Sequence, residues 1–401
     1  MRGLRAIADC GAVVAAACFW NAAAPAQSPD PATPPTYSRV ATMAVPGNPL
    51  ASFDIGYVDR RLPLYYLADR NNAALDIFET VHNRFLTRVG GFVGARSATT
   101  GGSIPTPPGG TITTAVSGPN GVVPVGVGEV WVGDGDSSVK VVDLFTQSVV
   151  ATISTARPGH DADTDKRADE MAYDPADHIL VVANNAAVPP FVTFISTRPE
   201  DRRVLGQVVF DQYAGVEQSV WNPRTGRFYV NLTALNSDPE TGGVAVVNPK
   251  TLQVTQIFPV TGCEPAGLAV GPRQELLVGC GATANSQIIS ALDGTVEATI
   301  TQVAGSDEVW FNRSDRRYYL AARNNPAANG GPVLGVIDAR TNAFLARVPT
   351  DVSAHSVAAD ARTNLVYVPL GPIPADPDCA TACIGIYGAS DRPREGGLAA
   401  K

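Results

Sequence analysis

The chain has 401 residues, of which 45% are hydrophobic and 17% are charged, and its formal net charge at pH 7 is -8. That length is enough to bury a large core in one or more domains. Lysine and arginine form no concentrated run, and a protein that binds nucleic acid needs a concentrated positive surface. We therefore expect no nucleic-acid partner.

The first residues have the organisation of a secretory signal. Two arginines precede an apolar run at 11–20, and residues 24–26 (Ala-Pro-Ala) offer a cleavage site. We expect residues 1–26 to be a signal peptide that is removed on export. A lipoprotein anchored through Cys18 is the alternative, although Ala15 stands where a large aliphatic residue is expected.

The remaining chain contains no apolar run of the roughly 20 residues that a membrane-spanning helix needs. We therefore expect a periplasmic or secreted protein with no transmembrane segment in the mature chain. Residues 27–36 read as a flexible, proline-rich N-terminus, 37–390 as one domain and 391–401 as a disordered tail.

A pattern of short strands recurs along the domain about every 45 to 50 residues. Segments 170–185 (EMAYDPADHILVVANN) and 308–325 (EVWFNRSDRRYYLAARNN) each read as a strand, a turn built on Asp or Asn, and a second strand. Two further strands follow in each unit, and no helical period interrupts them. Four short strands per unit are typical of a β-propeller blade.

Seven such units fit the chain, and a Gly/Pro-rich insertion at 94–118 lengthens the first interval. The last unit has only three strands, whereas the strand at 37–45 (YSRVATMAV) has no blade of its own. Closing the ring would remove the unpaired backbone groups of an open edge. The sequence therefore predicts an all-β, seven-bladed propeller that is closed by an N-terminal strand completing the last blade.

Three short motifs carry a family resemblance. Residues 228–231 (Phe-Tyr-Val-Asn), 243–248 (Gly-Val-Ala-Val-Val-Asn) and 336–338 (Val-Ile-Asp) resemble the repeats of the YVTN-type, or YncE-like, seven-bladed propellers of exported bacterial proteins. The resemblance covers nearly the whole mature chain. It implies a binding or surface role, and no catalytic signature comes with it.

Polar residues open the inner strand of every predicted blade. Because neighbouring strands are antiparallel, the start of the first strand and the end of the second should meet at one face of the propeller, called here the top face. The residues that open the inner strands are Asp54, Asn120, Asp169, Glu217, Glu264, Asp307 and His355, with Glu170 and Glu308 beside them. The residues that end the second strands are Asp69, Asp134, Asn184, Asn231, Cys280, Asn324 and Leu370.

We expect this ring to be a ligand-binding surface. Carboxylates so close raise one another's pKa unless a cation or a basic partner intervenes. Trp310 follows the ring on an inner strand, and Arg70 and Arg323 follow second-strand ends, where they either neutralise the acids or hold a carboxylate ligand. The alternative is that most ring acids are structural or merely solvated.

Four cysteines remain after the signal, an even number that favours disulfides in an exported protein. Cys263 directly precedes Glu264, and Cys280 ends the second strand of the same unit. We expect these two to pair near the top face, and Cys379 to pair with Cys383 across a short loop.

Three functions remain open. The first is a monomeric binding protein whose acidic top face recognises a small molecule, a glycan or a periplasmic protein. The second is a lactone hydrolase or lyase that holds Ca²⁺ or Mg²⁺, with His355 as general acid or base. The third is a structural scaffold in which the ring is incidental. In the second, the metal ligands would be Asp169, Glu217, Glu264 and Asp307.

Overall fold

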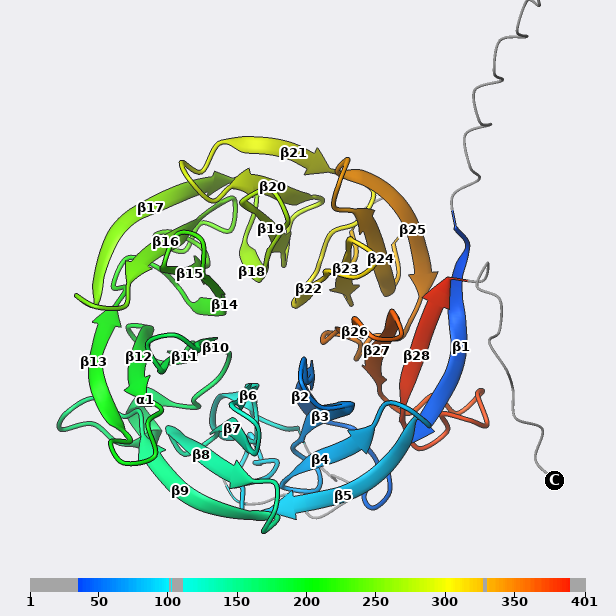
Figure 1. Ribbon diagram of the computed structural model, residues 1–401, viewed down its shortest axis with the longest axis horizontal. Coiled ribbons are helices and arrows are strands. Elements are labelled where there is room, and N and C mark those ends of the chain that lie inside the picture. Colours follow the sequence, from blue (N-terminus) through cyan, green and yellow to red (C-terminus); the bar gives the residue numbers. More distant parts are fainter. Residues whose placement is uncertain (1–34, 101, 103–110, 327–329, 390–401) are drawn as a thin grey trace, which may run out of the picture. The chain divides into compact units, whose positions relative to one another are not determined.

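The computed structural model describes residues 35–100, 102, 111–326 and 330–389. The predicted signal peptide at 1–26, most of the N-terminal segment 27–36 and the predicted tail at 391–401 lie outside the described residues. Within the described part, seven four-stranded antiparallel sheets are arranged around one axis (Figure 1). The prediction of a seven-bladed β-propeller is confirmed.

Each of blades 1 to 6 takes four consecutive strands, with the first of them innermost. The strands of blades 1 to 3 are β2 (Phe53–Val58), β3 (Leu64–Asp69), β4 (Ala74–Glu79) and β5 (Arg84–Gly90); β6 (Val122–Val125), β7 (Glu129–Asp134), β8 (Ser138–Asp143) and β9 (Ser148–Ser154); and β10 (Met171–Asp174), β11 (Ile179–Asn184), β12 (Phe191–Ser196) and β13 (Arg203–Val209). The strands of blades 4 to 6 are β14 (Val216–Asn222), β15 (Arg227–Leu232), β16 (Thr241–Asn248) and β17 (Gln253–Thr261); β18 (Pro265–Val270), β19 (Glu275–Cys280), β20 (Ser286–Ser290) and β21 (Val296–Ile300); and β22 (Val309–Asn312), β23 (Arg317–Ala322), β24 (Val333–Asp338) and β25 (Ala343–Pro349).

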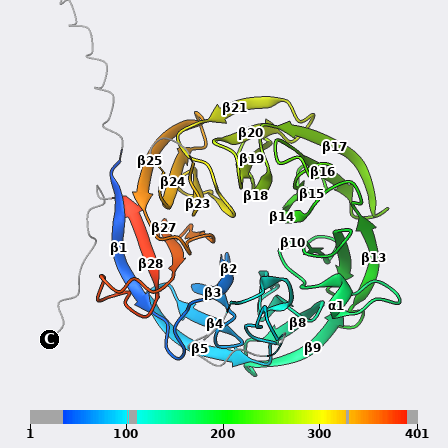
Figure 2. The same ribbon diagram turned by 180° about the vertical axis from the view of Figure 1, so that it is seen from behind.

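Blade 7 joins the two ends of the propeller. Its strands are β26 (Ala358–Asp360), β27 (Leu365–Leu370), β28 (Cys383–Ala389) and, outermost, β1 (Tyr37–Ala44). β1 pairs antiparallel with β28 from Tyr37 opposite Ala389 to Ala44 opposite Cys383. Figure 2 shows the same blue and red pair from behind. The N-terminal strand therefore completes the last blade, as the sequence predicts.

Burial follows the position of each strand within its blade. The second strands are almost entirely buried, because neighbouring blades cover both of their faces. The outermost strand β9 alternates between exposed and half-buried residues, as expected where one face meets solvent. Apolar clusters lie between successive blades and continue around the ring, so the core is a set of blade interfaces.

Two glycines let blades 2 and 3 approach closely. A Cβ on Gly133 would lie 2.5 Å from the carbonyl oxygen of Ala168, and a Cβ on Gly121 would overlap the carbonyl of Asp169. Any side chain at these positions would push blade 2 away from the segment that leads into the inner strand β10 of blade 3. The described helices are short: η1 (Thr114–Val116) in the insertion and α1 (Ala162–Asp165), which Asp161 caps.

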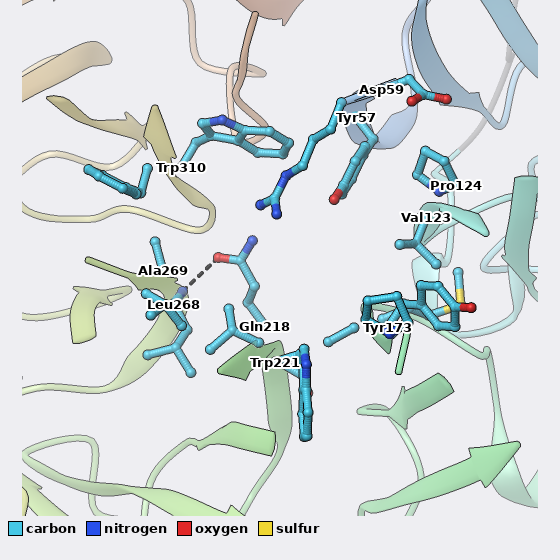
Figure 3. A pocket seen from close by; sticks show the side chains of 18 of the residues that line it. Tyr57, Asp59, Val123, Pro124, Tyr173, Gln218, Trp221, Leu268, Ala269 and Trp310 are labelled. Atoms are coloured by element: carbon cyan, nitrogen blue, oxygen red, sulfur yellow. Dashed lines mark hydrogen bonds between the residues drawn. The ribbon is translucent and has the colours of Figure 1, made fainter. Parts of the chain in front are cut away.

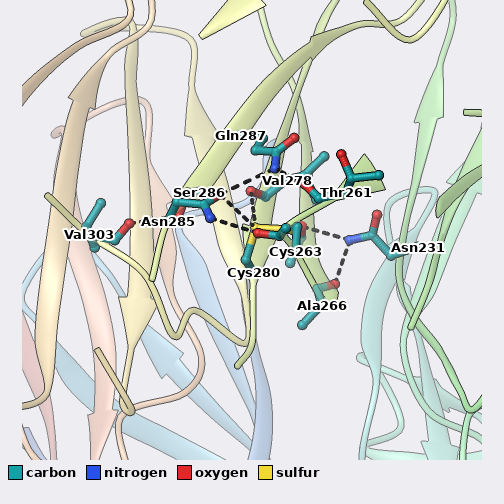
Figure 4. The surroundings of a disulfide bond; sticks show 12 residues. Asn231, Thr261, Cys263, Ala266, Val278, Cys280, Asn285, Ser286, Gln287 and Val303 are labelled. Carbon is teal, nitrogen blue, oxygen red and sulfur yellow. Dashed lines mark hydrogen bonds between the residues drawn. A yellow bond between two sulfur atoms is a disulfide. The ribbon is translucent and has the colours of Figure 1, made fainter. Parts of the chain in front are cut away.

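Both predicted disulfides form, between Cys263 and Cys280 and between Cys379 and Cys383. Figure 4 shows that the first lies within a network of amide side chains. Asn285 donates to the carbonyl of Gly262, the neighbour of Cys263, at 2.7 Å. None of the helices in the described ranges has the length and apolar character needed to cross a bilayer.

Candidate functional site

The inner strands begin at one face, and their backbones bring the predicted ring together. The N–H of Asp169 donates to the carbonyl of Ala183 at 2.7 Å, so the start of β10 lies against the end of β11. At this face, a cavity of about 260 Å³ opens between blades 1, 3, 6 and 7, and we call it the top pocket. The charged side chains and the imidazole that line it are Asp54, Arg70, Arg167, Asp307, Arg323 and His355.

Arg70 anchors one wall of the top pocket. Its side chain is 4% exposed and forms an ion pair with Asp54. Its Nε also donates to Asn120 at 3.0 Å, and its Nη1 donates to the carbonyl of Phe53 at 3.0 Å. Asn120 in turn donates to the carbonyl of Ala168 at 3.1 Å. These bonds hold the starts of blades 1, 2 and 3 in one polar chain.

His355 extends this chain to blade 7. Its Nε2 lies 3.3 Å from a carboxylate oxygen of Asp54, and its Nδ1 lies 2.6 Å from the carbonyl oxygen of Ser353. The ring stacks on Phe53 with centroids 4.8 Å apart and planes 10° apart. Both ring nitrogens therefore face oxygen acceptors.

Two further arginines border the pocket with N–H groups to spare. Arg167 donates from Nε to Asp169 at 2.6 Å, and Arg323 pairs through Nη2 with Asp307 at 2.8 Å. Within the described part of the chain, the two terminal nitrogens of Arg167 make no other hydrogen bond. The exposed fractions of the two side chains are 14% for Arg167 and 38% for Arg323. Both guanidinium groups are therefore held in place while part of each remains accessible.

The arginines divide the ring acids into two kinds. Burial alone would raise the pKa of Asp54, but Arg70 and His355 outweigh it and hold that pKa below its ordinary value. Burial raises the pKa of Asp169 to about 6, with Arg167 acting in the opposite direction. Burial and the nearby Asp307 raise the pKa of Glu217 to about 8. The surroundings thus favour the ionised form of Asp54 and the protonated form of Glu217.

Glu170 and Glu308, which follow Asp169 and Asp307 in the chain, are buried. They are 6% and 2% exposed, and each has one carboxyl oxygen without a partner among the described residues. The other carboxyl oxygen of Glu308 accepts a hydrogen bond from Ser356 at 2.8 Å. Burial raises the pKa of both groups well above the ordinary value, and the neighbouring acids add to this effect. Neither side chain lines the top pocket.

Other members of the predicted ring take different positions. Glu264 is half-buried, and burial raises its pKa. Asn185 holds Glu217 through long contacts of 3.4 and 3.5 Å. Trp310 does not line the top pocket. It lines a second cavity, which is formed by later residues of the inner strands. Among the residues that the structure describes, no three His, Cys, Asp or Glu side chains form a group that could hold a metal ion.

The second-strand ends point elsewhere. Asp69 and Asp134 are fully buried inside their blades, where they pair with Arg88 and Lys140. The residue that follows Asp69, Arg70, faces the pocket instead, because successive side chains along a strand face opposite sides.

Sequence reasoning did not single out Arg167 or Thr114, which also line the top pocket. Arg167 stands two residues before Asp169, a spacing that in an extended segment places two side chains on the same side. This spacing in the sequence could have identified Arg167 as a neighbour of Asp169 at the site. Thr114 belongs to the insertion at 94–118, and nothing in the sequence marks it as a residue of the top pocket.

Comparisons with known proteins identify the fold. No protein-family model matches the chain, and no curated protein matches its sequence. Among solved structures, a chain of a mitotic checkpoint complex superposes with a TM-score of 0.59 and 11% sequence identity. The match covers 88% of this chain and 93% of that chain. At this identity the likeness establishes a seven-bladed β-propeller and nothing about function.

Proposed function

We propose that the protein is an exported, YVTN-type binding propeller whose top pocket recognises a small dicarboxylate. The observation that carries this proposal is the pair of arginines, Arg167 and Arg323, that border one cavity with unengaged N–H groups. Guanidinium groups bind carboxylates through two parallel N–H donors, and two arginines suit two carboxylates.

The surrounding acids support this role. Asp169 and Asp307 each hold one nitrogen of an arginine, so the guanidinium groups keep their orientation before a ligand arrives. Preorganised donors bind more tightly, because less side-chain entropy is lost on association. His355 adds a further polar group to the wall. Asp169 and Asp307 therefore position the two guanidinium groups. With these groups in place, the top face binds an anionic ligand instead of a cationic one.

The size of the pocket limits the ligand. Its volume of about 260 Å³ lies slightly below the range of ligand pockets, which begins near 300 Å³. A short-chain acid suits such a cavity better than an oligosaccharide does. Two disulfides support export, because such bonds persist in oxidising compartments.

Calorimetric titration with succinate tests the proposal, with succinamide as the uncharged analogue at matched ionic strength. We expect succinate to bind, and R167Q and R323Q each to weaken it at least about tenfold, the loss expected for one charge-assisted pair. R203Q removes an exposed arginine on β13 and serves as the matched control. Equal binding of succinate by wild type and by R167Q/R323Q, or no binding of any short dicarboxylate, would contradict the proposal.

A further inference from the structure

A second cavity, of about 330 Å³, lies at the other end of the central channel, and we call it the lower pocket (Figure 3). It is formed by the later residues of the inner strands and by the turns that follow them. The residues that line it and those that line the top pocket have no member in common. A ligand here would therefore bind independently of the dicarboxylate site.

Aromatic side chains from four blades form the wall of the lower pocket. Tyr57, Tyr173, Trp221 and Trp310 are each half-buried and each border the cavity. Trp310 packs edge-on against Tyr57, with ring centroids 4.9 Å apart and planes at 76°. This contact fixes Trp310 and Tyr57 against each other, and the partial burial of all four rings leaves part of each accessible to a ligand. Accessible rings of this kind bind planar groups by stacking.

Two polar groups point into this aromatic cavity. The side-chain oxygen of Gln218 accepts hydrogen bonds from the backbone N–H groups of Leu268, at 2.6 Å, and Val309, at 3.3 Å. This fixes the amide, and Figure 3 shows its nitrogen directed into the cavity together with the hydroxyl of Tyr57. The hydroxyl of Tyr173, by contrast, lies 3.4 Å from His178 Nδ1. The cavity thus offers oriented donors to an oxygen on the ligand.

Two arginines place positive charge at the rim of the lower pocket. Arg60 and Arg61 are exposed in the turn after β2, and both border the cavity. Neither side chain forms an ion pair within the described ranges. The carboxylate of the neighbouring Asp59 is directed to other partners, since it accepts from the backbone of Arg61 at 2.7 Å and from the hydroxyl of Tyr66 at 3.1 Å.

We propose that the lower pocket binds a hydroxylated aromatic carboxylate. The ring lies against the tryptophan and tyrosine side chains, the ring hydroxyl meets Gln218 and Tyr57, and the carboxylate extends toward Arg60 and Arg61. Apolar walls with a few oriented polar groups are typical of small-molecule sites, and the charged rim selects an anion.

Calorimetry with 6-hydroxynaphthalene-2-carboxylate tests this assignment. We expect the double variant R60A/R61A, which changes only exposed turn residues, to weaken the acid about tenfold and to leave the corresponding carboxamide unchanged. W310L removes one stacking surface and should weaken both compounds about tenfold. Naphthalene-2-carboxylate, which lacks the hydroxyl, should bind more weakly than the hydroxylated acid.

Two controls separate this site from others. R198A/R203A removes the same charge at exposed positions beside and on β13, and should leave binding unchanged. Saturating succinate should not displace the aromatic acid, because the two pockets are lined by different residues. Absence of binding, an affinity unaffected by both W310L and R60A/R61A, or competition with succinate would overturn the proposal.

Discussion

The imidazole of His355 lies 3.3 Å from Asp54, a residue 301 positions earlier in the chain. This contact joins blade 7 to blade 1 at the top face, whereas the pairing of β1 with β28 closes blade 7 at its outer edge. Asp54 also pairs with Arg70, which continues through Asn120 toward blade 3. The buried carboxylate of Asp54 therefore lies at the centre of a series of polar contacts that runs from blade 7, where the ring closes, to blade 3.

Replacing Asp54 should destabilise the fold strongly. D54N leaves the guanidinium of Arg70, whose side chain is 4% exposed, without a charge partner. Breaking a buried pair by removing one partner costs about 3–5 kcal/mol. Urea denaturation should show this loss in the free energy of unfolding.

The matched control is D201N, which breaks the exposed pair of Asp201 with Arg203. Exposed pairs contribute about 0–1 kcal/mol, so this variant should stay close to wild type. Equal effects of D54N and D201N would show that the buried pair does not hold the blades together.

Stability should fall as the pH rises above 4.5, the ordinary pKa of a glutamate. Glu170 and Glu308 have pKa values raised by burial, so the folded state binds protons that the unfolded state has already released above the ordinary Glu pKa of 4.5. A raised pKa contributes stability at low pH that is lost as the pH rises toward the folded-state pKa. Stability therefore falls over the pH range in which the unfolded state has released these protons and the folded state still holds them.

The double variant E170Q/E308Q should flatten this pH dependence. Its melting temperature should fall by at least about 3 °C less than that of wild type between pH 5 and 8, a difference on the scale of 2 kcal/mol for a domain of about 350 residues. E200Q, at an exposed loop position before β13, is the control and should retain the wild-type slope. A parallel slope in E170Q/E308Q would contradict the assignment of buried, protonated glutamates.

The two disulfides should contribute different amounts to the free energy of unfolding. Cys263 and Cys280 are 17 positions apart, whereas Cys379 and Cys383 are 4 apart. A longer closed loop removes more entropy from the unfolded chain, which predicts losses of about 3 kcal/mol for C263A/C280A and about 2 kcal/mol for C379A/C383A. Urea denaturation of the two double variants checks the order, and the reverse order would contradict it.

Calcium or magnesium should leave the melting temperature unchanged within about 1 °C, whereas a site filled at 100 times its Kd would add about 2.7 kcal/mol. The physical reason is that Arg167 and Arg323 already neutralise Asp169 and Asp307. Differential scanning fluorimetry measures the shift. A larger rise that disappears in E217Q/D307N would favour the metal-dependent lactone hydrolase or lyase instead.

The repeat alone was enough to predict the fold, and strand polarity indicates which residues begin at the top face. It does not indicate which of them line the pocket, because Asn120, Asp169, Glu217 and Glu264 do not. Asp54, Asp307 and His355 do line it. Side-chain direction was harder to predict. Asp69 and Arg70 are adjacent in the sequence, yet only Arg70 reaches the pocket, and the buried partner of Asp69, Arg88, lies on another strand.

The position of a residue along the axis of the propeller was equally hard to predict from the sequence. Trp310 stands three residues after Asp307, which at a strand's rise corresponds to roughly 10 Å. The two residues consequently border different cavities. The width of the space around the axis between Asp307 and Trp310 is determined by side chains from several blades together. That width decides whether a tryptophan belongs to the ring at the top face or to a separate pocket, and the sequence does not show it.

The pairing of β1 with β28 has a consequence for how the chain matures. The earliest strand to leave the ribosome finds its permanent neighbour only after residues 383–389 have been made. Until then, residues 37–44 remain a single unpaired segment. A chain interrupted before that point keeps both a solitary strand and an unfilled place beside β27, so interrupted chains should be preferred targets for proteases and prone to exchange strands with one another.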